Sequence, residues 1–75
     1  MSSNRVEVSP HDFSGDAFGW FVTVQCGSQW GSRAIFRGEE AAHGAAKDLF
    51  EVQTQEEALA IFRLWQRRDY AGTNA

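Results

Sequence analysis

The sequence predicts an α+β fold, a small antiparallel sheet with two helices packed on one face. Three patterns predict it: a pair of aromatic-rich segments with alternating apolar residues, an alanine-rich segment with helical spacing, and a longer amphipathic segment near the C-terminus. With two shorter segments they give the order β-β-β-α-β-α. Because 75 residues suffice for one core only, we expect a single domain over residues 1–75, with flexible ends at 1–4 and 71–75.

Alternation between charged and apolar residues predicts the first strand. Residues 5–8 read Arg-Val-Glu-Val and therefore fit a half-buried strand. Ser9 and Pro10 follow, and we expect the strand to stop there because proline has no N–H for a sheet ladder. Residues 11–16 contain Asp, Ser and Gly and are predicted to form a loop.

The next two strands, residues 18–26 and 30–37, are predicted to form a hairpin. A three-residue loop, 27–29, would pair Cys26 with Trp30 and collect apolar side chains on one face. A two-residue turn would instead place arginines beside apolar residues of the facing strand. We therefore predict the longer loop, although a glycine at the first loop position is commoner in two-residue turns.

This register sorts the side chains of the hairpin onto two faces. The face that we expect the helices to cover holds Phe18, Trp20, Val22, Val24, Trp30, Ala34 and Phe36. The opposite face holds a Phe21–Ile35 cross-strand pair, surrounded by Thr23, Gln25, Arg33 and Arg37. An apolar centre with a polar, arginine-bearing rim is the composition of a protein interface.

The first helix is predicted after Gly38, where Glu39 and Glu40 supply the acidic residues that a helix N-terminus favours. Alanines recur at helical spacing in the turns that follow, and such a stripe lets a helix lie close to a sheet. Gly44 either assists this close approach or weakens the helix. Residues 49–53 are then predicted to form a short strand or extended link.

The second helix has the clearest start. Residues 54–57 read Thr-Gln-Glu-Glu, which fits a capping box in which Thr54 and Glu57 each accept from the other's main-chain N–H. One side of the helix then collects the apolar residues Ala58, Ile61, Phe62 and Trp65, flanked by Leu59 and Leu64. We expect the helix to end near Asp69.

Composition excludes several classes of protein. A hydrophobic share of 43% is too high for a disordered chain, and the single cysteine, Cys26, excludes an internal disulfide framework. The net charge of −3 argues against an autonomous nucleic-acid binder and favours a basic protein partner. We expect a cytoplasmic protein, because no apolar run is long enough to span a membrane and the first residues lack the apolar segment of a signal peptide.

The sequence predicts no catalytic, metal-binding or cofactor-binding residue, and we expect a protein that is not an enzyme. A thiol enzyme would need Cys26 beside His11 or His43, and no flanking motif supports that arrangement. A structural cysteine is the simpler interpretation. The two histidines lie 32 positions apart, without the spacing of metal ligands, and the glycines do not form a phosphate loop.

An RNA-binding domain is a further alternative. The run Phe-Gly-Trp-Phe at residues 18–21 is similar to the aromatic centre of the RNP1 pattern, in which rings on a sheet stack on bases. Asp16 and Ala17 stand where that pattern has a basic residue and a glycine, and Thr23 stands where it has an aromatic ring. Alternation along a strand explains the same rings as core residues.

We expect the function to be protein binding. The predicted contact residues are the apolar anchors Phe21, Ile35 and Trp30, the neighbouring Arg33 and Arg37, and the helix-start acids Glu39, Glu40, Glu56 and Glu57. Two exposed apolar residues can also have no function, and the N-terminal segment could fold over them. The same face could equally form a homodimer.

In its size, its mild acidity and its lack of an active-site motif, the chain resembles phage-encoded inhibitors of the anti-CRISPR type. The resemblance concerns the build of the whole chain. It implies that the partner is a Cas subunit or another protein of a nucleic-acid machine, which the inhibitor blocks by occupying its surface. The alternative is a self-associating structural or regulatory module, such as an accessory phage protein or an antitoxin-like partner.

Overall fold

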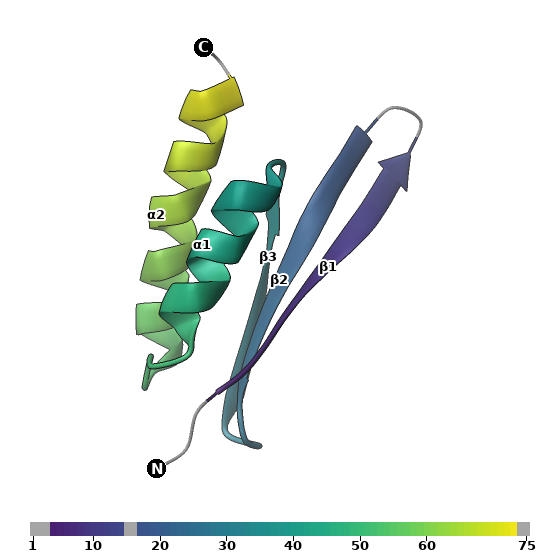
Figure 1. Ribbon diagram of the computed structural model, residues 1–75. Helices are drawn as coiled ribbons and strands as arrows, with labels where there is room; N and C mark the ends of the chain where they lie inside the picture. Colours follow the sequence, from purple (N-terminus) through teal and green to yellow (C-terminus); the bar gives the residue numbers. More distant parts are fainter. Residues whose placement is uncertain (1–3, 15–16, 74–75) are drawn as a thin grey trace.

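The computed structural model describes residues 4–14 and 17–73, except for the side chains of 12–14, 17–18 and 70–73. The elements are β1 (Arg5–Ser14), β2 (Ala17–Cys26), β3 (Trp30–Phe36), α1 (Glu39–Leu49) and α2 (Gln55–Thr73). They form a three-stranded antiparallel sheet in the order β1-β2-β3, with both helices on one side of it (Figure 1). The predicted α+β class is confirmed, and the observed order is β-β-β-α-α.

The hairpin of β2 and β3 has the predicted register. Cys26 pairs with Trp30, and the pairing continues to Trp20 opposite Phe36. In the turn, the Gln29 N–H donates to the Cys26 carbonyl at 3.0 Å, and Gly27 has a φ of +55°, a conformation that favours glycine. The longer loop therefore forms in place of the two-residue turn because its register buries one apolar face.

β1 continues through Pro10 to Ser14, so the predicted stop at Pro10 and the predicted loop that follows are wrong for the described residues. The Ile35 carbonyl accepts a hydrogen bond from α2, so the main-chain groups of Ile35 point away from β2. Main-chain groups alternate in direction along a strand, so those of the next residue, Phe36, point toward β2 and bond to Trp20. Because the main-chain groups of Trp20 point toward β3, none of them faces β1. Pro10 lies opposite Trp20 on β1 and therefore directs its ring nitrogen away from β2. At this edge position the missing N–H costs the sheet no hydrogen bond.

No strand forms at residues 49–53, where the sequence predicted a short strand or an extended link. Leu49 is the fully buried last residue of α1, and the chain then turns toward α2. Asn4 holds this turn: its side-chain amide donates to the carbonyls of Leu49 at 2.9 Å and Val52 at 2.7 Å. These carbonyls bond to a side chain instead of a neighbouring strand, and Asn4 is buried where a flexible end was expected.

α2 begins with the predicted capping box. The Glu57 N–H donates to Thr54 Oγ1 at 3.2 Å, and Glu57 Oε1 accepts from the Thr54 N–H at 3.2 Å. The helix runs to Thr73, beyond the predicted end near Asp69. Asp69 is buried, and its contacts with the segment before α1 tie this last part of the helix to the fold.

The core lies between the sheet and the two helices. α1 packs against β2 and α2, and α2 packs against α1 and β3 (Figure 1). The buried apolar residues are Val22, Val24, Phe36, Ala42, Ala45, Ala46, Leu49, Val52, Ala58 and Phe62. Trp20, Trp30 and Ala34 pack against this cluster, as predicted for the covered face, whereas the side chain of Phe18 lies outside the described residues.

Candidate protein-binding face

The sheet has a second face, on the side opposite the helices (Figure 1). Side chains alternate along each strand, so the neighbours of the buried Val22, Val24 and Phe36 point to this second face. Cross-strand pairs show which residues share it. We call it the open face, and it holds Arg5, Glu7, Ser9, His11, Phe21, Thr23, Gln25, Arg33 and Ile35.

Phe21 and Ile35 form the centre of the open face, directly opposite each other on β2 and β3. Ile35 is 45% exposed. The His11 ring lies 4.8 Å from the Phe21 ring, measured between centroids, and the Arg33 guanidinium carbon lies 4.7 Å from the Phe21 centroid. A cation above an aromatic face is an attractive contact. Phe21 is thus flanked by two groups that hold its ring in place.

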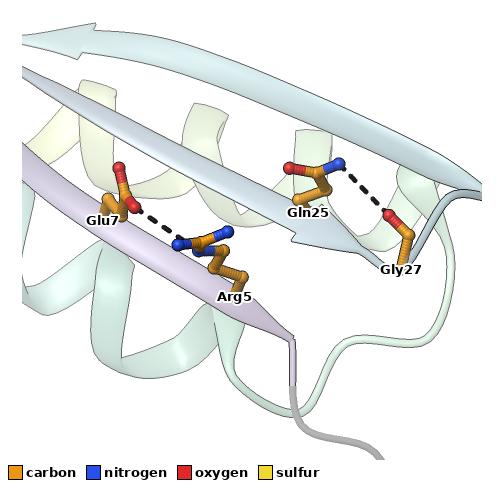
Figure 2. Close-up of polar contacts among 4 residues, drawn as sticks. All are labelled: Arg5, Glu7, Gln25 and Gly27. Carbon is orange, nitrogen blue, oxygen red and sulfur yellow. Dashed lines mark hydrogen bonds and ion pairs between the residues drawn. The ribbon is translucent and has the colours of Figure 1, made fainter.

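The half of the open face nearer the β2–β3 turn is polar. Arg5 and Glu7 form an ion pair at 3.5 Å, and the Gln25 amide donates to the Gly27 carbonyl at 3.2 Å (Figure 2). A shallow depression lies along Thr23, Gln25 and Arg33 here. An open surface of this kind suits contact with another surface better than enclosure of a small molecule.

Trp30 does not extend the open face, although the sequence predicted it among the contact residues. It pairs with Cys26 and packs, half-buried, against the core on the helix side of the sheet. Its indole Nε1 is buried and has no hydrogen-bond partner among the described residues. The sequence had placed Trp30 on the helix-facing side by parity, and the structure confirms that side.

The four predicted acidic contacts do not join the open face either. Glu39 and Glu40 lie in the first turn of α1, and Glu56 and Glu57 in the first turn of α2, all exposed in the helical layer. Glu39 lies 3.8 Å from His43. Glu57 is part of the capping box. The first turn of α2 lies beside the sheet end that carries the β2–β3 turn, where Gln55 donates to the Gly31 carbonyl at 3.3 Å.

Arg33 is on the open face as predicted, whereas Arg37 lies just beyond the end of β3. The Arg37 N–H donates to Asp69 Oδ2 at 2.6 Å, and the Gly38 N–H donates to Asp69 Oδ1 at 2.9 Å. Gly38 is the N-cap residue of α1 and has no side chain to cap the helix. Asp69 of α2 instead binds the N–H of this N-cap residue and of the residue before it, and its negative charge suits a helix N-terminus.

Sequence reasoning missed His11 as a part of the open face. It pairs with Gly19 near the far end of β1 and reaches Phe21 diagonally. The signal was available: alternation continues from Arg5 through Ser9 to His11, but Pro10 and the turn-forming residues within 11–16 argued against extending the strand. A proline whose nitrogen faces away from the neighbouring strand does not stop pairing.

The described residues do not bring the thiol and the imidazoles together. Gly19, which pairs with His11, lies seven residues before Cys26 on β2, roughly 23 Å along the strand. The His43 ring lies 6.1 Å from that of Trp20, also distant from the Cys26 end of β2. The Cys-His arrangement weighed from the sequence is therefore wrong. Within the described part of the chain, no group of three or more His, Cys, Asp or Glu residues could hold a metal ion.

Comparisons with known proteins add no assignment to this geometry. The chain matches no protein-family model, no curated protein and no solved structure. Among the described residues, neither helix has the length and apolar character needed to span a membrane.

Proposed function

We propose that this chain is a small, non-catalytic protein-binding module that docks on a larger protein through its open face. The observation that carries the proposal is the exposed Ile35 opposite Phe21, at the centre of a sheet face that the helices leave uncovered. The polar residues around this pair complete the composition of a non-obligate interface. The main chain of β1 extends the sheet sideways and does not cross the open face.

The charges on the open face indicate the character of the partner's surface. Among the described side chains, the open face carries two arginines, Arg5 and Arg33, and one carboxylate, Glu7, whereas the other acids lie in the two helices and in the segment between them. Local charge governs the contact more than net charge does. The net charge suggested a basic partner; the open face favours a partner surface with acidic groups around an apolar centre.

A narrower form of the proposal concerns the class of partner. The resemblance in build to phage-encoded anti-CRISPR inhibitors supports a Cas subunit or another protein of a nucleic-acid machine, blocked by occupation of its surface. The single cysteine, which cannot form a disulfide within the chain, supports a cytoplasmic setting for this interaction. In the alternative form, the open face is covered by a second copy of the chain.

The test compares two substitutions that introduce the same charge on opposite sides of the molecule. Phe21→Glu places a carboxylate at the centre of the open face, and Leu64→Glu places one on α2, where Leu64 is 48% exposed. Both variants should keep a native circular dichroism spectrum. Affinity capture from a host lysate, followed by reconstitution with the purified protein, should yield a partner that binds the wild type and Leu64→Glu but not Phe21→Glu.

Sedimentation velocity separates the two forms of the proposal. A wild-type monomer that forms a complex with the captured protein supports docking on a larger protein. A wild-type dimer that Phe21→Glu converts to a monomer would support self-association instead. Equal capture by Phe21→Glu and by wild type would exclude the open face as the contact surface.

A further inference from the structure

The outer edge of β3 exposes main-chain groups that no other strand pairs with in the described structure. Two glutamines of α2 reach this edge: Gln55 donates to the Gly31 carbonyl at 3.3 Å, and Gln66 donates to the Ile35 carbonyl at 3.2 Å. Main-chain groups alternate in direction along a strand. Arg33, midway between these two residues, therefore directs its own N–H and C=O outward at the same edge.

A groove runs between this edge of β3 and α2. Its apolar part is formed by Ile35, Leu59 and Phe62, and Arg33 and Arg63 flank it. Ile35 is 45% exposed and Leu59 is 39% exposed, so the groove presents apolar surface to solvent. Apolar side-chain contacts thus adjoin a row of available main-chain donors and acceptors, which are the two components of recognition by strand addition.

The charges of the groove select the chemistry of its occupant. Among the described residues, no carboxylate lies within the 4.0 Å of an ion pair from Arg33 or Arg63. A second copy of this chain is disfavoured, because a two-fold pairing of β3 centred on Arg33 would set two guanidinium groups opposite each other. A strand with carboxylates would place opposite charges there instead.

We propose that the groove binds an extended acidic segment of a partner protein, which adds to β3 as a fourth strand. Its main chain pairs with Arg33, its aliphatic side chains enter the groove beside Leu59 and Phe62, and its carboxylates face Arg33 and Arg63. This surface shares Ile35 and Arg33 with the open face and extends beyond it onto Leu59, Phe62 and Arg63 of α2.

The two glutamine contacts occupy part of the β3 edge but do not prevent another strand from pairing with it. Gln55 and Gln66 satisfy two carbonyls with exposed hydrogen bonds, and exposed neutral bonds of this kind contribute little net stability. The incoming segment can replace them with main-chain bonds as the glutamine side chains rotate away. The glutamines therefore disfavour non-specific strand pairing at this edge, whereas a segment with complementary charge can displace them.

The experiment selects peptides from a phage-displayed library of short random sequences against the immobilised full chain. We expect enriched peptides in which acidic and aliphatic residues alternate. Against Arg63→Glu, which reverses one charge of the groove, enrichment should shift to basic residues. Lys47→Glu, the same change of charge on exposed α1, should leave the acidic preference unchanged.

A synthetic copy of the most enriched peptide then gives the affinity by fluorescence anisotropy. It should bind Arg63→Glu about tenfold or more weakly than wild type, and lose a similar factor when its central main-chain nitrogen is methylated. The proposal is overturned if no sequence is enriched, if the enriched peptides are not acidic, or if Arg63→Glu or methylation has no effect. If the wild type binds the peptide and Phe21→Glu still captures the partner, the open-face proposal is overturned and the groove proposal stands.

Discussion

Gly44 of α1 lies directly against the indole of Trp65 in α2, so close that a Cβ at position 44 would be 2.5 Å from two of its ring carbons. Trp65 is fixed in this position: its Nε1 donates to Asp48 Oδ2 at 2.8 Å, and the Arg68 guanidinium carbon lies 4.7 Å from its ring. The sequence left open whether Gly44 assists a close approach to the sheet or weakens the helix, whereas the close approach observed is to the other helix. The absence of a side chain at this position sets the distance between the helices.

We expect Gly44→Ala to lower the free energy of unfolding by up to about 2 kcal/mol. Displacing the Trp65 ring costs roughly 1–3 kcal/mol as an overpacking effect, and the better helix propensity of alanine returns about 1 kcal/mol. Urea unfolding followed by circular dichroism measures the difference. In a Trp65→Ala background the same substitution should stabilise the protein, since the clash is gone; stabilisation in the wild-type background would contradict this role for Gly44.

Asp69→Ala should lower the free energy of unfolding by about 2–4 kcal/mol, because it leaves the main-chain N–H groups of Arg37 and Gly38 without their acceptor. Asp69→Asn keeps one acceptor oxygen and should cost less. Glu51→Ala, which also removes a carboxylate but at an exposed position, is the matched control and should change stability little. Equal losses for Asp69→Ala and Glu51→Ala would show that the bonds of Asp69 to these two amides are unimportant for stability.

The elements predicted well from the sequence are those whose determinants are local. The hairpin register follows from the alternation around Val22 and Phe36, because only one register buries a continuous apolar face. The start of α2 follows from two residues, Thr54 and Glu57, that bond each other. At the candidate site, Phe21, Ile35 and Arg33 were placed on the correct face because alternate residues of a strand point to the same side of the sheet.

The elements predicted wrongly depend on contacts between distant residues. Asn4 bonds to carbonyls that lie 45 and 48 positions later, and these bonds replace the strand expected at residues 49–53. Asp69 bonds to amides 31 and 32 positions earlier, and α2 continues past this residue to Thr73. A single polar residue carries no local pattern that reveals such a partner. The groove on α2 was missed likewise, because it exists only once α2 lies beside β3.

Asn4→Asp tests the tie between the N-terminal segment and the end of α1. The substitution keeps the size of the side chain but replaces the N–H donor by a carboxylate, which cannot donate to the carbonyls of Leu49 and Val52. We expect a loss of about 2–4 kcal/mol, at least as large as that of Asn4→Ala, since the carboxylate also repels the carbonyls. Thermal unfolding measures both. A smaller loss for aspartate than for alanine would contradict the donor role.

Glu57→Gln separates the structural role of Glu57 from the partner contact predicted for it. Glutamine keeps a side-chain oxygen that can accept from the Thr54 N–H, so the capping box and the stability should be preserved within about 0.5 kcal/mol, whereas Thr54→Ala should cost about 1 kcal/mol. The negative charge, in contrast, is lost. Because Glu57 lies in the helical layer, we expect Glu57→Gln to bind the captured partner as tightly as wild type in an anisotropy titration. A weaker complex at unchanged stability would restore the acidic turn of α2 to the interface, and would mean that the partner reaches beyond the open face.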